Sequence, residues 1–176
     1  QNINDIRTAG LITVENNEVT NFYNHLNSGL QDTRASNPIA VSIRVSGSVF
    51  DNQGNLWMTN IGTPQELKKL SSGGAWSGFD ISTIKETGAF GLTEIIVDRN
   101  NSIWMGSRRD GALVFNENGN RMRALTTQAT RGSLPNSNVR AVAADGNNRI
   151  WIGTLSGLVV FNNASGLFDA DIYDAS

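Results

Sequence analysis

The sequence predicts an all-β fold: a β-propeller fragment of about three and a half four-stranded antiparallel blades. The main observation is a repeat of 47 residues, in which an aspartate and a tryptophan return with constant spacing, as Asp51 and Trp57, Asp98 and Trp104, Asp145 and Trp151. The second is composition, since 22 asparagines and 18 glycines favour tight turns between short strands. Short strands without a long helical pattern, repeated at this period, are typical of propeller blades.

The last repeat indicates how each blade divides into strands. Its first strand alternates apolar and polar positions up to Asp145, and a short turn leads to a second strand over 149–154. A third strand over 157–162 and a fourth over 166–173 follow. The same pattern predicts the outer strands of one blade and then three whole blades, at residues 10–24, 39–80, 90–126 and 137–174.

An incomplete propeller predicts a partner. A blade cannot bury both of its faces alone, and propellers close at about four to eight blades. The chain begins inside a repeat, so we expect it to be a piece of a longer protein. Its end faces should be covered by the remainder of its own propeller or by a second copy of the chain, two halves making a seven-bladed ring.

Composition excludes several classes of protein. With 14 basic and 16 acidic residues the formal net charge is −2, which gives no electrostatic footprint for nucleic acid. The absence of cysteine excludes a disulfide scaffold and thiolate metal sites. No apolar run approaches the length of a membrane-spanning helix, and no motif indicates a cofactor.

The repeat resembles that of a known family. The stretch 133–140, leading into Asp145 and then into 151–154, is similar to the two-component-regulator propeller repeat. That repeat is found in extracytoplasmic sensors of hybrid two-component systems in Bacteroidetes. The resemblance covers nearly the whole chain and implies a location in the periplasm or at the cell surface of a Gram-negative bacterium.

One irregular blade resembles a narrower family. After Trp57 the chain continues through 58–60 to a Gly-Ala-Trp-Ser-Gly-Phe run at 74–79, and the last repeat passes through 160–169. This pattern is similar to the surface double-propeller proteins of the type IX (Por) secretion system. In that family the propellers lead to a C-terminal domain associated with anionic lipopolysaccharide and with surface attachment of the secretion sortase. The resemblance implies contacts with secretion-system proteins and anionic glycan.

The repeated aspartates and tryptophans have a structural and a functional interpretation. Calcium loops bring several carboxylates together, whereas each turn here offers one, at Asp51, Asp98 or Asp145. We therefore expect these carboxylates to accept backbone N–H groups and fix the turns. The three repeated tryptophans could stack on sugars, but their constant place in the repeat favours packing between blades.

Trp76 and His25 stand outside the repeat. Trp76 lies on a fourth strand among glycines and is a candidate for contact with a glycan, the alternative being packing at a strand edge. His25 is the only histidine, and without a cysteine or a second histidine it gives no metal signature. No nucleophile elbow accompanies it, so we predict no catalytic residue.

The second whole blade is locally basic. In a four-stranded meander the loops after the second and fourth strands open on one face, which predicts that Arg108, Arg109 and Arg131 lie together. Arginine forks suit phosphate and carboxylate, so these arginines are the candidate site for an anionic glycan. The alternative is that they are ordinary solvated side chains, one of them paired with Asp110.

Two functions from different classes follow. The first is a non-catalytic propeller scaffold or binding segment of a type IX secretion system surface protein, with protein contacts and contacts to anionic lipopolysaccharide. The alternative is a periplasmic ligand-sensing segment of a hybrid two-component regulator. A lyase or hydrolase ranks third, because the sequence offers neither a carboxylate pair nor a histidine constellation.

Overall fold

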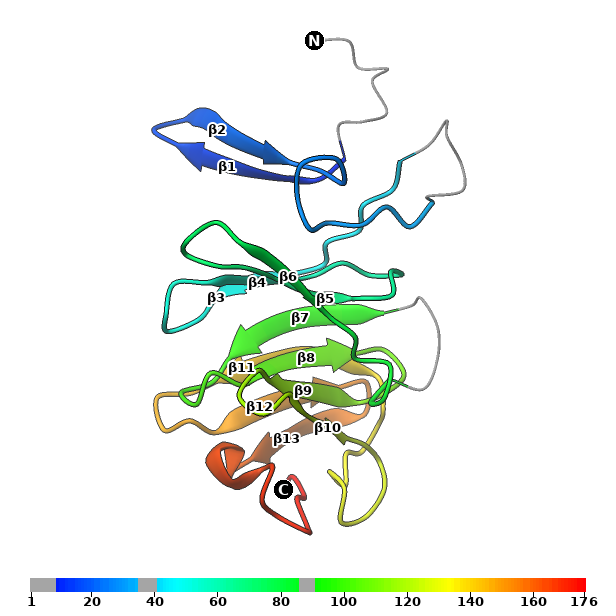
Figure 1. The fold of residues 1–176 in the computed structure, drawn as a ribbon. Coiled ribbons are helices and arrows are strands. Elements are labelled where there is room, and N and C mark those ends of the chain that lie inside the picture. The colour runs from blue at the N-terminus through cyan, green and yellow to red at the C-terminus, as the bar shows by residue number, and fades with distance from the viewer. Residues whose placement is uncertain (1–8, 35–40, 86–90) are drawn as a thin grey trace.

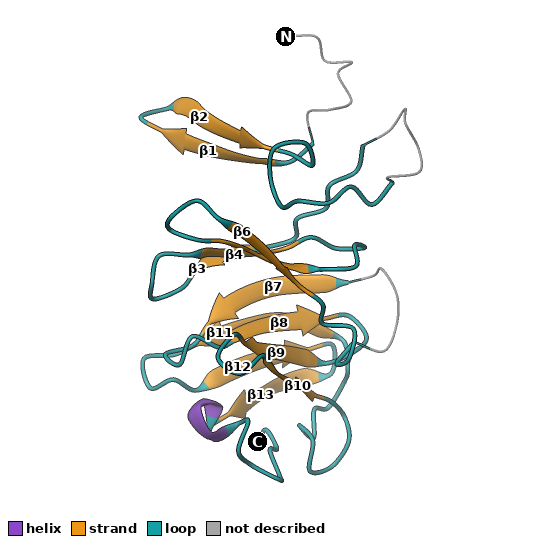
Figure 2. Cartoon of the chain, viewed as in Figure 1, coloured by secondary structure: helices purple, strands orange, loops and turns teal. Residues whose placement is uncertain are grey.

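A computed structural model describes residues 9–34, 41–85 and 91–176 of the chain. In these ranges short strands form sheets that are stacked one after another from the N-terminal to the C-terminal end (Figures 1 and 2). A single 3-10 turn, η1 (Ala164–Gly166), is the one helical element of the described part.

The strands fall into four groups, which we name by their order. The outer pair contains β1 (Leu11–Glu15) and β2 (Glu18–Tyr23). Blade one contains β3 (Ser48–Phe50), β4 (Leu56–Thr59), β5 (Leu67–Leu70) and β6 (Trp76–Phe79). Blade two contains β7 (Leu92–Val97), β8 (Ile103–Ser107), β9 (Ala112–Asn116) and β10 (Arg121–Leu125). Blade three contains β11 (Val139–Ala144), β12 (Ile150–Thr154) and β13 (Gly157–Phe161).

Each sheet is an antiparallel meander in which every strand pairs with the next along the chain. This confirms the predicted all-β propeller fold of about three and a half blades. The strands lie within the predicted ranges 10–24, 39–80, 90–126 and 137–174, of which residues 39–40 and 90 lie outside the described residues. The first strands of the three blades, β3, β7 and β11, lie against one another in that order.

The prediction of a fourth strand over 166–173 is wrong. After β13 the chain turns into η1, where the Asn163 side chain accepts a hydrogen bond from the Gly166 amide at 3.1 Å. Leu167 is then buried in the core beneath blade three, which takes the chain out of the sheet. Ser176 returns to β13 and makes two backbone hydrogen bonds with Val160, of 2.8 and 2.9 Å.

The turn between the first two strands of each blade is built around the repeated aspartate. In blade two, one carboxylate oxygen of Asp98 accepts the amides of Asn100 at 2.8 Å and Ser102 at 2.9 Å. The other oxygen accepts the indole N–H of Trp104 at 3.0 Å. The aspartate therefore closes the turn and satisfies the tryptophan with a single carboxylate.

The other two blades repeat this arrangement. The carboxylate of Asp51 accepts the indole N–H of Trp57 at 2.8 Å, and that of Asp145 accepts the indole N–H of Trp151 at 3.1 Å. Burial raises the pKa of Asp51, but hydrogen bonds from Asn55 and Trp57 outweigh this effect and hold the pKa below its usual range. The charged carboxylate is thus the form that the folded turn stabilises.

A second repeated contact ties the turns of blades two and three to the turn of the preceding blade. Asn101 and Asn148 stand three residues after the turn aspartate and adopt a left-handed backbone, with φ of 57° and 62°. The side-chain oxygen of Asn101 accepts the amide of Asn52 in blade one at 3.3 Å. That of Asn148 accepts the amide of Arg99 in blade two at 2.9 Å. Both donors occupy the same position of the repeat, so neighbouring blades are held in register by an identical bond.

Apolar side chains fill the two spaces between the whole blades. Alternate residues of β8 and β9 face opposite sides, as the pleat requires. One set packs against blade one together with Trp57, and the other packs against blade three together with Trp104 and Phe161. Trp57 and Trp104 are 2% and 0% exposed, whereas Trp151 is only half-buried on the outer face of blade three. The repeated tryptophan is thus a packing residue wherever a following blade covers it.

The segment after the outer pair meets blade one through polar contacts. The side chain of Asn60 bonds both backbone groups of Gln31, at 2.6 Å to the amide and 3.2 Å to the carbonyl. The ammonium of Lys68 donates to the Gln31 side chain at 2.9 Å and is itself buried. Burial lowers the pKa of Lys68 from 10.5 to about 8. This joint therefore buries a cation that donates to a neutral side-chain amide.

Replacing Asp98 with alanine should lower the free energy of unfolding by about 3 kcal/mol, because it leaves buried N–H donors without an acceptor. Urea denaturation followed by tryptophan fluorescence measures the change. The matched control is Asp145→Ala, at the same position of a turn that is more exposed, with 23% of the carboxylate side chain accessible. An equal or larger loss in the control would contradict burial as the cause.

Replacing Lys68 with methionine should raise stability at pH 7 by about 1–2 kcal/mol, since it removes a buried charge. The pH dependence gives a second readout. The folded pKa of Lys68 is lowered, so the unfolded chain binds more protons between pH 8 and 10.5, and the wild type gains stability across that interval. The variant should lack this gain in a series of urea melts from pH 7 to 10.5.

Candidate functional site

Blade two borders a cavity on the face where the loops after its second and fourth strands open. The cavity has a volume of about 850 Å³. Its wall combines the β8–β9 turn, strand β10 and the loop from β10 to β11, which supply Arg109, Arg123 and Arg131 respectively. We call it the basic cavity, and the charged and aromatic residues that define it are Arg109, Asp110, Arg123, Arg131, Asp171 and Tyr173.

Arg123 is held in place on the wall of the basic cavity. Its guanidinium lies 4.6 Å from the ring centre of Tyr173 and donates to the carbonyl of Phe168 at 3.1 Å. Stacking on an aromatic face and a bond to a carbonyl both suit the planar guanidinium. These two contacts therefore hold the guanidinium of Arg123 in one position on the cavity wall without a ligand.

Arg109 and Arg131 differ from Arg123 because both side chains are exposed. Neither forms an ion pair with a carboxylate of the described residues. Asp110 does not pair with these arginines. Its carboxylate accepts a hydrogen bond from the Ser107 hydroxyl at 2.7 Å and is buried in the turn. Two guanidinium groups thus border the cavity with their forks available to an anion.

The C-terminal segment forms one side of the basic cavity and is pinned by a carboxylate. The two oxygens of Asp174 accept the amides of Thr130 at 3.1 Å and Gly132 at 3.0 Å. The Tyr173 amide donates in return to the Thr130 carbonyl at 3.1 Å. These bonds fix the loop that carries Arg131.

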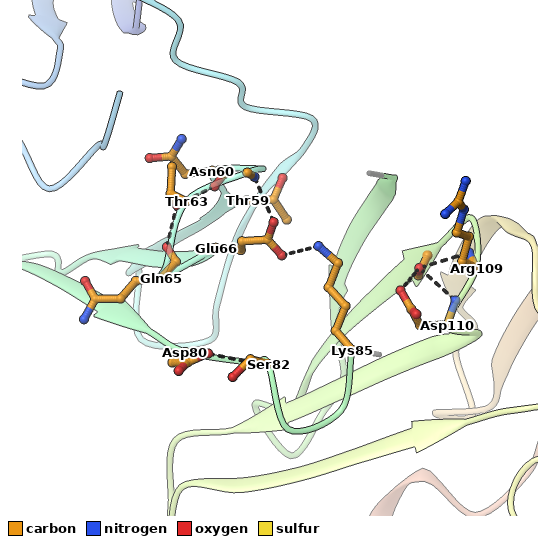
Figure 3. A network of polar contacts seen from close by, with 12 residues as sticks. Thr59, Asn60, Thr63, Gln65, Glu66, Asp80, Ser82, Lys85, Arg109 and Asp110 are labelled. Carbon is orange, nitrogen blue, oxygen red and sulfur yellow. Dashed lines mark hydrogen bonds and ion pairs between the residues drawn. The ribbon is translucent and has the colours of Figure 1, made fainter. Parts of the chain in front are cut away.

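Blade one has a smaller hollow at the equivalent place, between its β4–β5 loop and the segment after β6. We call it the blade-one hollow; its volume is about 370 Å³, and Thr63, Glu66, Asp80, Ile81, Ser82 and Lys85 are among its lining residues. Glu66 accepts the Gly62 amide at 2.8 Å and the Lys85 ammonium at 2.5 Å, so its charge is compensated (Figure 3). The pKa of Asp80 lies below its usual range because the amide and hydroxyl of Ser82 donate to its carboxylate.

The structure separates the residues that the sequence grouped together. Arg109 and Arg131 share the basic cavity, but Arg108 does not line it and packs over Gly91 instead. Trp76 is half-buried against Gly29 and edge-on to Tyr23, with ring centres 5.6 Å apart. It lines neither the basic cavity nor the blade-one hollow.

Three residues of the basic cavity were missed at the level of sequence. Arg123 reaches the cavity from strand β10, whereas the prediction considered only the arginines of the loops. Asp171 and Tyr173 belong to the segment that was expected to be a strand. His25 lies on the segment after β2 and lines neither hollow. Among the described residues, no three acidic, histidine or cysteine side chains gather in a way that could hold a metal ion.

Comparison with known proteins bears on the repeat and on the fold. Residues 133–156 match the family model of the two component regulator propeller. The chain carries that repeat. No curated protein matches the sequence.

Solved structures share the fold at low sequence identity. PorZ, a surface component of the type IX secretion system of Porphyromonas gingivalis, aligns with a TM-score of 0.76 and 22% identity, over 97% of this chain and 24% of its own. The extracellular domain of a hybrid two component system of B. thetaiotaomicron aligns with a TM-score of 0.60 and 23% identity, over 87% and 18%. Virginiamycin B lyase of Staphylococcus aureus aligns with a TM-score of 0.51 and 12% identity, over 66% and 37%.

The chain spans about a quarter of the length of PorZ and less of the second structure. These likenesses establish a propeller fold that serves both surface proteins and an enzyme. In the described part of the chain, no helix is long and apolar enough to cross a membrane.

Replacing Asp174 with alanine should loosen the loop that carries Arg131, because the amides of Thr130 and Gly132 lose their acceptor. Since Asp174 is exposed, we expect global stability to change little. Amide hydrogen exchange should quicken at Thr130 and Gly132 and stay unchanged in β8 and β9. The control is Asp169→Ala, at a carboxylate whose side chain is 81% accessible; equal exchange in the two variants would contradict the pinning role.

Proposed function

We propose that the chain is a non-catalytic binding segment of an extracytoplasmic propeller, in a surface protein of the type IX secretion system, and that its basic cavity binds an anionic group of a surface glycan such as lipopolysaccharide. The similarity to PorZ over 97% of the chain supports the class of protein. The remaining propeller surfaces would serve protein contacts, with the remainder of the propeller covering the end faces.

The observation that carries the binding proposal is the pair of exposed arginines at one cavity. Arg109 and Arg131 border it without a carboxylate partner among the described residues, and Arg123 adds a fixed positive charge beside them. Planar guanidinium forks bind carboxylate or phosphate through two parallel hydrogen bonds. A volume of about 850 Å³ lies within the range of small-molecule sites.

The composition of the cavity favours binding over catalysis. An acid–base mechanism needs a group that can accept or deliver a proton beside the bound substrate. Of the two carboxylates that line the basic cavity, Asp110 is held by the Ser107 hydroxyl and Asp171 is exposed at the side of the cavity. His25 lines neither this cavity nor the blade-one hollow.

The double variant Arg109→Gln/Arg131→Gln should bind immobilised anionic lipopolysaccharide at least about tenfold more weakly than the wild type, because it removes charge-assisted hydrogen bonds. Biolayer interferometry at several salt concentrations measures this. The affinity of the wild type should fall as salt is raised, and the variant should show a weaker dependence.

Arg108→Gln is the matched control, since Arg108 is an exposed neighbour that does not line the cavity. It removes one positive charge, against two in the double variant, and should leave the affinity within about twofold of the wild type. If the control lost half as much binding free energy as the double variant, the loss would follow net charge alone and contradict a specific site. No binding by the wild type would overturn the glycan proposal.

The second candidate is a ligand-sensing segment of a hybrid two-component regulator, which the family match over 133–156 favours. Such a segment would take a small ligand in the same cavity. If free glucuronate bound as tightly as the anionic lipopolysaccharide, the result would support the sensor over the surface protein.

A further inference from the structure

The basic cavity and the blade-one hollow occupy equivalent positions in neighbouring blades. Each opens between the loop after a second strand and the segment after a fourth strand. In a four-stranded meander these loops lie at the same end of the sheet, so both openings belong to one face of the propeller.

One short segment separates the two openings. Asp80, Ser82 and Lys85 line the blade-one hollow, whereas Thr83 and Ile84, between them in sequence, line the basic cavity. A backbone bond from the Ile84 amide to the Ile81 carbonyl, 3.1 Å long, closes a turn in this segment. Consecutive residues thus form a wall that the two openings share, and Figure 3 shows Arg109 on the far side of Lys85 from Glu66.

The two openings differ in chemistry. Arg109, Arg123 and Arg131 make the basic cavity suited to an anion. The blade-one hollow has a compensated ion pair, Glu66 with Lys85, and offers the exposed carboxylate of Asp80. A carboxylate accepts hydrogen bonds from hydroxyl groups and repels another anion.

We infer that the two openings form one groove for a linear glycan in which acidic and neutral sugars alternate. The acidic group is held by Arg109 and Arg131, and the hydroxyl groups of the adjoining neutral sugar are held by Asp80. This inference rests on the proposed function, since it needs the basic cavity to hold an acidic sugar.

Each opening alone is large enough for a small ligand. The dependence of affinity on ligand length therefore distinguishes two separate sites from one groove. A free acidic sugar meets only the arginines. A longer chain adds hydrogen bonds at Asp80 without a second loss of translational freedom, and its affinity rises accordingly. A chain made only of acidic sugars places a carboxylate beside Asp80 and gains less.

Hyaluronan oligosaccharides, in which glucuronate alternates with N-acetylglucosamine, are the probe. Isothermal titration of the wild type should give a hexasaccharide at least about tenfold tighter than glucuronate. Asp80→Ala should bring the hexasaccharide close to the affinity of glucuronate and leave glucuronate binding unchanged. A hexasaccharide of galacturonate, acidic at every sugar, should bind the wild type more weakly than the hyaluronan hexasaccharide.

The control for the loss of a surface carboxylate is Asp169→Ala, which lies on the C-terminal segment and lines neither opening. It should keep the full advantage of the hexasaccharide. Equal affinities for glucuronate and the hexasaccharide, or an Asp80→Ala variant that retains the advantage, overturn the shared groove while the arginine site stands. If Arg109→Gln/Arg131→Gln binds glucuronate as well as the wild type does, the proposed function itself fails.

Discussion

A tryptophan buried between two blades needs an acceptor for its indole N–H, and the aspartate six residues earlier supplies it. The same carboxylate takes two amides of the turn, so the packing of the blade face and the path of the turn depend on one side chain. Because a charged carboxylate is buried at modest cost only when its oxygens are bonded, the turn, the tryptophan and the aspartate stabilise one another. This coupling explains why the two residues recur together.

The contact between neighbouring turns depends on this arrangement. Asn101 and Asn148 can reach the preceding blade because the closed turn holds them in a left-handed conformation, which asparagine tolerates better than most residues. The equivalent position in blade one is Gly54, with φ of 78°, which has the conformation but no side chain to offer. Blade one accordingly meets the segment after the outer pair through Asn60, Gln31 and Lys68 instead. Among the described residues, the asparagine bond is therefore found only where a blade follows another blade.

The sequence sufficed for the parts of the fold that repeat and failed where repetition stops. In blades one and two the number and order of the strands and the places of Trp57 and Trp104 follow from periodicity, because the same local rule applies to both. The C-terminal segment follows no such rule, and its path depends on the burial of Leu167 and on the bonds of Asp174, which join residues distant in sequence. Arg108 and Arg109 are adjacent, yet only Arg109 lines the cavity. The geometry of the tight turn separates the two side chains, and composition does not predict this geometry.

The two ends of each blade therefore have different freedom to vary. The end with the aspartate turns is constrained by packing, since its side chains hold tryptophans and neighbouring turns. At the other end the loop after the second strand spans 60–66 in blade one, 108–111 in blade two and 155–156 in blade three. Loops of different length at a fixed place on a stable sheet create hollows of different size without disturbing the core. The residues proposed to bind a ligand, Arg109, Arg131 and Asp80, can accordingly differ between blades while the aspartate and tryptophan stay the same.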